Sequence, residues 1–181
     1  MNDGNGWVFP KQAAYQILTM TNIRINPASE TDLPLIFSFI KEFADYVHLS
    51  HEVAATQEIL RETLFGSKRY AEVLIARLDD LPVGFAIFFH NFSTFLGKPG
   101  IYLEDLFVLP DFRSKGIGKA LLIYLAKLAL ERGCGRFEWA VLDWNESAAE
   151  FYKRLGAVPL DDLTIFRLTG ESLRKLASEQ G

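Results

Sequence analysis

The sequence predicts an α/β fold: a mixed, mostly antiparallel sheet with helices on both faces. The first observation is the order of the strand-like and helix-like stretches, β-α-α-β-β-β-α-β-α-β. The second is their spacing, because strands joined by a short turn pair antiparallel, whereas strands separated by a helix can return in the same direction. The third is the size and composition, since 181 residues that are 49% hydrophobic suit one domain with a full core.

The first half of the chain supplies most of the expected antiparallel part. Residues 1–20 have no clear period and are interpreted as an N-terminal extension free to move, which leaves 21–181 as a single domain. Alternation of Ile23 and Ile25 with polar residues indicates a strand, and Gly66 is a helix stop. The elements predicted here are a strand over 21–26, helices over 33–48 and 56–65, and a hairpin of strands over 71–78 and 82–89.

The second half alternates strands with helices. Gly133 and Gly156 are helix stops, and Asn145 is a helix cap. The predicted elements are a polar and aromatic loop over 91–100, strands over 101–108, 136–142 and 164–169, and helices over 117–132, 146–155 and 171–178.

Charge and composition exclude several classes of function. The net charge of −4 argues against nucleic acid as the main partner, because phosphate backbones are bound by basic surfaces. The single cysteine, Cys134, rules out an intramolecular disulfide and a cysteine-based zinc site. His48, His51 and His90 lack the spacing and companions of a metal site, so no metal is expected. Neither a membrane span nor a signal peptide is expected, and the cytoplasm is the predicted location.

The stretch 111–125, DFRSKGIGKALLIYL, predicts a turn that opens a helix and binds an anion. It is not a P-loop, because that motif needs glycine where Arg113 stands and a hydroxyl where Ala120 stands. It is not a dinucleotide fingerprint either, because the third glycine is replaced by Leu121. A helix N-terminus with Gly116 and Gly118 still offers unpaired N–H groups, and a diphosphate fits such a site. The alternative is a basic loop that binds nothing.

Two adjacent carboxylates interrupt the apolar strand 101–108. Burying an unpaired charge is unfavourable, so the presence of Glu104 and Asp105 in an apolar strand indicates a function or a partner for them. In a regular strand they point to opposite faces, and a bulge would re-aim them. The alternatives are a strand end that reaches solvent and a salt bridge to a nearby basic residue.

Three spaced motifs together resemble the GNAT superfamily of acetyl-CoA-dependent N-acetyltransferases. The turn Arg113-Ser-Lys-Gly-Ile-Gly118 meets every fixed position of the family signature [QR]-x-x-G-x-[GA]. The segments 144–146 (WNE) and 151–157 (FYKRLGA) follow it, and similarity extends over about residues 21–178. YLEDLFV, AVLDWNE and FYKRLGA are similar to the spermidine/spermine and thialysine acetyltransferase branch. The resemblance implies the GNAT fold, in which the sheet splays between the strands that end at Val108 and begin at Arg136.

The resemblance also implies how acetyl-CoA would be held. The backbone of the turn would bind the pyrophosphate, the end of the strand would pair with the pantetheine arm, and the start of the later helix would contact the cofactor from the other side. An N–H in the strand segment, that of Val108, would polarise the thioester carbonyl. The cofactor residues so implied are Leu106, Phe107, Val108, Arg113, Ser114, Lys115, Gly116, Ile117, Gly118, Lys119, Asn145, Glu146, Ser147 and Ala148.

The implied reaction is direct transfer to a primary amine within a ternary complex. Such an amine has a pKa of about 10.4 and must lose a proton before it attacks. Glu104 is the candidate base through a water, with a pKa raised by apolar surroundings, and Tyr152 would protonate the leaving thiolate. Substrate contacts are expected from Glu104, Asp105, Tyr46, Glu138, Trp139 and Ala140.

The acceptor and the assembly are less closely specified. Val47 and Ser93 stand where polyamine enzymes are expected to have acids, and Phe95 where they have a tryptophan, so a diamine or thialysine is as well supported as a polyamine. The resemblance implies a homodimer. Two alternative functions stay open: a GNAT-fold regulatory module that holds CoA, and a protein or peptide N-acetyltransferase.

Overall fold

The computed structural model describes residues 22–179, which form two compact units divided after Ala140. The N-terminal extension expected over 1–20 lies outside the described residues. The first unit contains the sheet and most of the predicted site residues. The second unit contains the two last helices, and each unit is described by itself.

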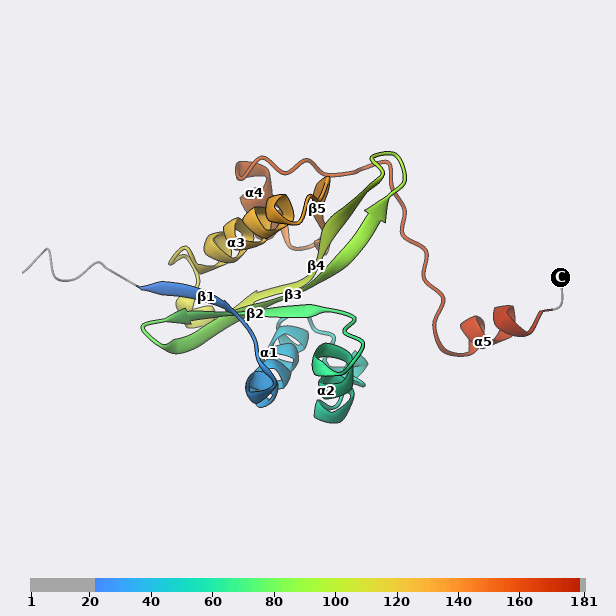
Figure 1. Cartoon of the computed structure of the whole chain (residues 1–181), viewed down its shortest axis with the longest axis horizontal. Helices are drawn as coiled ribbons and strands as arrows, with labels where there is room; N and C mark the ends of the chain where they lie inside the picture. The colour runs from blue at the N-terminus through green and yellow to red at the C-terminus, as the bar shows by residue number, and fades with distance from the viewer. Residues whose placement is uncertain (1–21, 180–181) are drawn as a thin grey trace, which may run out of the picture. The chain divides into compact units, whose positions relative to one another are not determined.

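The first unit is built on a five-stranded sheet in the order β1-β2-β3-β4-β5 (Figure 1). Pairing is antiparallel from β1 to β4 and parallel between β4 and β5, so the predicted mixed sheet is confirmed. The strands are β1 (Ile23–Pro27), β2 (Glu72–Leu78), β3 (Leu81–Ser93), β4 (Lys98–Val108) and β5 (Arg136–Trp139).

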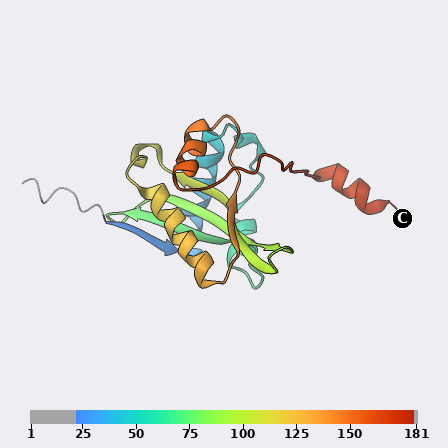
Figure 2. The ribbon, with the colours of Figure 1, turned by 90° about the horizontal axis from the view of Figure 1, so that it is seen from above.

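Helices cover both faces of this sheet. Helices α1 (Leu33–Tyr46) and α2 (Gln57–Phe65) lie on one face, and α3 (Ile117–Glu131) crosses the strands on the other (Figures 1 and 2). The side chain of Thr56 accepts a hydrogen bond from the Ile59 N–H and caps α2. Three 3₁₀ turns, Glu30–Asp32, Ser50–Glu52 and Pro110–Phe112, complete this unit.

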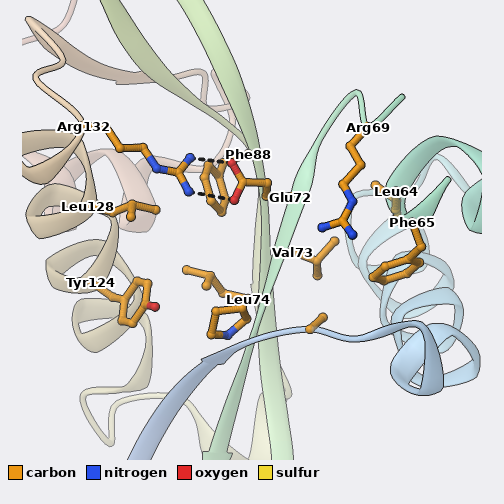
Figure 3. A pocket seen from close by; sticks show the side chains of 12 residues that line it. Leu64, Phe65, Arg69, Glu72, Val73, Leu74, Phe88, Tyr124, Leu128 and Arg132 are labelled. Carbon is orange, nitrogen blue, oxygen red and sulfur yellow. Dashed lines mark hydrogen bonds and ion pairs between the residues drawn. The ribbon is translucent and has the colours of Figure 1, made fainter. Parts of the chain in front are cut away.

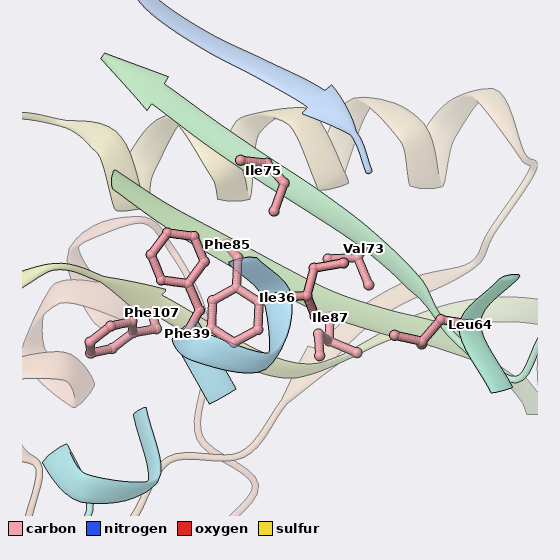
Figure 4. Packing of buried hydrophobic residues seen from close by; sticks show 8 residues of the cluster. All are labelled: Ile36, Phe39, Leu64, Val73, Ile75, Phe85, Ile87 and Phe107. Carbon is pink, nitrogen blue, oxygen red and sulfur yellow. The ribbon is translucent and has the colours of Figure 1, made fainter. Parts of the chain in front are cut away.

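An aromatic core fixes α1 against the sheet. The rings of Phe39 and Phe85 stack with centroids 5.4 Å apart, and Phe107 meets both of them at 6.5 Å (Figure 4). All three side chains are buried, and burial stabilises such a side chain by about 1.5–3 kcal/mol. Because Phe107 belongs to β4, this packing holds the strand of the acid pair against α1.

The prediction of a loop over 91–100 is wrong, because these residues form the end of a long hairpin, with a turn between Ser93 and Lys98. Strand β3 continues to Ser93 and β4 begins at Lys98, with Asn91 paired to Gly100. Ser93 is buried, and its hydroxyl accepts a hydrogen bond from the Leu96 N–H across the turn. Backbone pairing across the hairpin extends the strands through a polar and aromatic sequence that has no strand period of its own.

Two other expected strands also differ from the structure. Strand β5 ends at Trp139 rather than at residue 142, and its pairing with β4 ends there too. Residues 164–169 form no strand in the described part of the chain. A strand needs a partner edge, which local alternation of side chains does not supply.

The second unit holds α4 (Glu146–Arg154), α5 (Gly170–Ser178) and a connection without regular structure. Asn145 caps α4 as predicted, since its side-chain oxygen accepts a hydrogen bond from the Ala148 N–H at 3.3 Å. The connection exposes Val158, Ile165 and Phe166, each with at least 74% of its surface accessible.

Candidate active site

A β-bulge puts both carboxylates of the acid pair on one face of the sheet. Ile87 of β3 pairs with Asp105, and the next residue, Phe88, pairs with Leu103, so Glu104 is an extra residue in β4. Leu103 lies on the α3 face with Phe88, and Asp105 lies on the α1 face with Ile87. Counted from Leu103, the alternation of side chains turns Glu104 to the α1 face. The bulge then leaves Asp105 on this same face instead of the opposite one. The bulge considered from the sequence is therefore present.

The buried carboxyl of this pair is Asp105, not Glu104. The Glu104 side chain is exposed, so the apolar surroundings expected for it are absent. Asp105 is partly buried; this burial, with the neighbouring Glu104 charge, raises the pKa of Asp105 to about 6. With a pKa of about 6, the Asp105 carboxyl is still mostly ionised at neutral pH.

One edge of β4 is open beyond the acid pair. The parallel pairing with β5 covers only Gly100 to Leu103, while β4 continues to Val108, which is the predicted splay of the sheet. The Leu109 N–H donates to the Val83 carbonyl at 2.9 Å, and hydrogen-bonded pairs recur at every second residue of an antiparallel pair. Phe107 therefore directs its backbone groups toward β3, whereas Leu106 and Val108 direct theirs to the open edge.

Phe107 consequently differs from its expected role. Its N–H and C=O belong to the β3 ladder, and its ring packs in the core on α1. The backbone groups of residues 106–108 that face the open edge belong to Leu106 and Val108. The sequence shows which segment forms the edge. Which residues of that segment direct their N–H and C=O groups to the open side depends on the pairing with β3.

The turn between β4 and α3 has the geometry of an anion site. Gly116 adopts a left-handed conformation with φ 84°, and Ser114 does so with φ 60°. The Ala120 N–H is the first to bond back into the helix, to the Gly116 carbonyl at 2.9 Å. The N–H groups of Ile117 to Lys119 therefore have no carbonyl partner within the helix and can serve a ligand.

Arg113 lies inside this turn and folds back toward α1. Its guanidinium carbon is 4.1 Å from the centroid of the Tyr46 ring and 5.8 Å from that of Phe107. Its Nε donates to the Val108 carbonyl at 3.1 Å. Tyr46, which the sequence assigns to the substrate, thus contacts a residue assigned to the cofactor.

Two of the three residues of 138–140 considered for the substrate make contacts within the protein. Glu138 forms an ion pair with the Arg136 Nε at 2.8 Å and accepts a hydrogen bond from Asn91 at 2.7 Å, so its charge is largely neutralised. Trp139 ends β5, and its ring is tilted against that of Phe137, with the centroids 4.8 Å apart. Ala140 directly follows the strand. The contact of Glu138 with Asn91 depends on the tertiary structure, because Asn91 belongs to β3.

The other predicted residues lie in the second unit. The side-chain oxygen of Asn145 caps α4 and is also 3.3 Å from the Ser147 hydroxyl. Glu146, Ser147 and Ala148 form the first turn of the helix. Tyr152 lies in its last turn, with its ring 5.4 Å from that of Phe151.

A hollow of about 150 Å³ at the other end of α3 contains none of the predicted site residues (Figure 3). Its polar feature is an ion pair in which Arg132 holds both oxygens of Glu72, at 2.5 and 2.8 Å. This interaction lowers the pKa of Glu72, and the remaining lining is mainly apolar. The pair joins α3 to the start of β2 and has a structural role.

Comparison with known proteins supplies the family. The acetyltransferase (GNAT) family model matches residues 36–157, which include the acid pair, the open edge and the turn. The chain belongs to the GNAT family. Members of this family use acetyl-CoA as the acetyl donor.

Full-length relatives agree with this assignment. Thialysine N-epsilon-acetyltransferase of Mus musculus is 37% identical over 87% of this chain and 99% of its own length. L-ornithine N5-acetyltransferase NATA1 of Arabidopsis thaliana is 33% identical over 84% of this chain and 87% of its own. An integron cassette protein from V. cholerae superposes with a TM-score of 0.73, at 30% identity, over 87% of this chain and 98% of that chain. This GNAT protein is thus an N-acetyltransferase.

No helix within residues 22–179 is long and apolar enough to cross a membrane.

Proposed function

We propose that this GNAT enzyme transfers the acetyl group of acetyl-CoA to a primary amine of a small cationic substrate, by direct attack within a ternary complex. One observation carries the proposal: the open edge of β4 runs without interruption from the acid pair at Glu104 and Asp105 to the anion-binding turn before α3. Such an edge can hold an extended donor with its phosphates at one end and its thioester at the other. The thialysine and ornithine acetyltransferases among the relatives support a small amine as the acceptor.

The donor is held mainly by backbone groups. The N–H groups of Ile117, Gly118 and Lys119 take the pyrophosphate at the start of α3, and the helix dipole adds to their attraction. Leu106 and Val108 pair with the pantetheine arm as an added strand would. An N–H of the open edge then polarises the thioester carbonyl, and the Leu106 N–H lies nearer to the acid pair than the Val108 N–H expected from the sequence. The Val108 carbonyl already accepts a hydrogen bond from Arg113.

Two proton transfers accompany the acetyl transfer. The amine arrives as an ammonium ion and is attracted by the two carboxylates of the bulge. Glu104, which is exposed, removes a proton through a water, and the neutral amine attacks the thioester carbonyl carbon. The C–S bond breaks, and the phenol of Tyr152 donates its proton to the leaving thiolate. The second proton that the nitrogen loses as the amide forms restores the phenol, and Glu104 releases its proton to water. Asp105 stays close to the cation and fixes its position.

The charge of the surroundings favours an acceptor the size of thialysine, ornithine or a diamine. Val47 and Ser93, where acids were expected for polyamines, are both buried in the structure. Glu138 is neutralised by Arg136. Glu104 and Asp105 are then the acids available to the amine, which suits one or two positive charges better than a long polycation.

We also propose that the enzyme is a homodimer. The exposed apolar side chains of the second unit, among them Val158 and Phe166, are typical of a surface that associates. Analytical ultracentrifugation tests this, and a monomer at micromolar concentration would contradict it. The cytoplasmic location stays a prediction, which cell fractionation tests.

A thiol-release assay tests the reaction. Acetyl-CoA is offered with thialysine, ornithine, lysine, putrescine, spermidine and a histone-tail peptide. We expect turnover on a small amine, with the rate reduced about 100-fold or more in Tyr152→Phe and in Glu104→Gln. Lys68→Gln is the control, since Lys68 lies over the ring of Tyr70, outside the site. Turnover on the peptide alone, or unchanged rates in both variants, would contradict the proposal.

A further inference from the structure

Arg113 joins three parts of the proposed site: its side chain contacts two of them and its backbone belongs to the third. Its guanidinium covers the ring of Tyr46 at the end of α1, a residue that the sequence assigns to the substrate. Its Nε is bonded to the carbonyl of Val108 at the end of β4. Its backbone belongs to the turn that receives the phosphates. The Tyr46 and Phe107 rings lie 6.3 Å apart and form the surface on which the guanidinium rests.

This geometry differs from that of a side chain serving only as a phosphate ligand. In such a side chain all the N–H donors of the guanidinium are available to the anion. Arg113 is half-buried, and its Nε already donates a hydrogen bond to the protein. Within residues 22–179 its two terminal nitrogens have no hydrogen-bond partner, and they are available to an anion. A bound anion would therefore fix a guanidinium that is already stacked on Tyr46, and the stack itself holds the side chain in place.

We propose that Arg113 is a positioning residue that couples the phosphate-binding turn to Tyr46, so that binding of CoA organises the acceptor side of the site. The proposal rests on the proposed function for the identity of the anion. The coupling requires the planar guanidinium of Arg113. In Arg113→Lys the positive charge is kept, but the contact with the face of the Tyr46 ring and the hydrogen bond from Nε are lost. Because coupling between two sites is reciprocal, a change at Tyr46 must also alter the affinity for CoA.

The experiment is a double-mutant cycle on CoA binding, measured by titration calorimetry. The four proteins are the wild type, Arg113→Lys, Tyr46→Leu and the double variant, each checked for folding by thermal unfolding. We expect Tyr46→Leu to weaken CoA binding about 3- to 10-fold, although Tyr46 belongs to α1 and not to the turn. In the Arg113→Lys background the same change should have no further effect, because the coupling residue is already gone.

Steady-state kinetics with the best amine supply a second readout. We expect Arg113→Lys to raise the KM for the amine about 5- to 30-fold, a change that a phosphate ligand alone would not cause. Lys115→Gln is the matched comparison: it lies in the same turn, with its ammonium over Phe112 rather than Tyr46, and should affect the KM for acetyl-CoA but not that for the amine.

The outcomes separate the two proposals. A wild type that binds no CoA would overturn the proposed function and the coupling together. If the wild type binds CoA but Tyr46→Leu leaves the affinity unchanged, or if the two changes multiply in the double variant, Arg113 is a phosphate ligand only. The coupling would then be wrong while the acetyltransferase function stands.

Discussion

Replacing Asp105 by asparagine should stabilise the enzyme at neutral pH while it impairs catalysis. Burial and the Glu104 charge raise the pKa of Asp105 from 3.8 to about 6. The folded state therefore binds the proton more tightly than the unfolded chain. Below about pH 4 both states are protonated and the carboxyl has no net effect. As the pH rises from about 4 to 6 the unfolded chain ionises first, so stability falls and then stays lower.

The size of the effect follows from the shift. About two pKa units correspond to about 3 kcal/mol of unfavourable free energy above pH 6. The amide that replaces the carboxyl in Asp105→Asn must itself be desolvated, so we expect a net gain of about 1–3 kcal/mol at pH 7.5. For a protein of this size that raises the Tm by about 3–8 °C.

The assay is thermal unfolding followed by circular dichroism from pH 4 to 8. The gap in Tm between Asp105→Asn and the wild type should be largest above pH 6.5 and should nearly close at pH 4. Glu104→Gln is the control. It removes the Glu104 charge, which is the smaller of the two causes of the raised Asp105 pKa, so it should also raise the Tm but by less. A gap that is absent at pH 7.5, or equal at both pH values, would refute this account of Asp105.

Three further changes test the scaffold around the site. In Gly84→Ala the new Cβ would lie 2.6 Å from the Phe107 carbonyl oxygen, so chemical denaturation should show a loss of about 2 kcal/mol or more. In Gly116→Ala the Cβ meets nothing within 4 Å, so the positive φ alone should lower stability by about 1 kcal/mol and weaken CoA binding measured by calorimetry. Glu72→Gln removes the partly exposed pair with Arg132 and should reduce stability by about 1 kcal/mol at pH 7. Because this pairing lowers the pKa of Glu72, its contribution is present above pH 4.5 and should vanish as the pH falls below it; a Tm difference that persists at pH 2.5 would contradict this.

Local signals in the sequence were sufficient for the helices and for the turn. Thr56 and Asn145 cap their helices with their own side chains, and Gly133 ends α3 in a left-handed conformation. The anion-binding turn was also predicted, because its chemistry depends on a few consecutive residues and a helix N-terminus. The hairpin beyond residue 90 was missed, because its strands are made by pairing rather than by their own pattern.

The sequence by itself determined the family, the order of the elements and the segment that carries the acid pair. Only the tertiary structure decided what the individual residues do. The bulge at Glu104 exists because β4 must pair with Ile87 and Phe88 at once, and it brings two adjacent carboxylates to one face. The hydrogen bond from Asn91 to Glu138 and the contact of Arg113 with Tyr46 likewise depend on partners distant in the chain. Capping and turn formation act between neighbouring residues, whereas the register of a sheet and the burial of a charge are set by the packed whole.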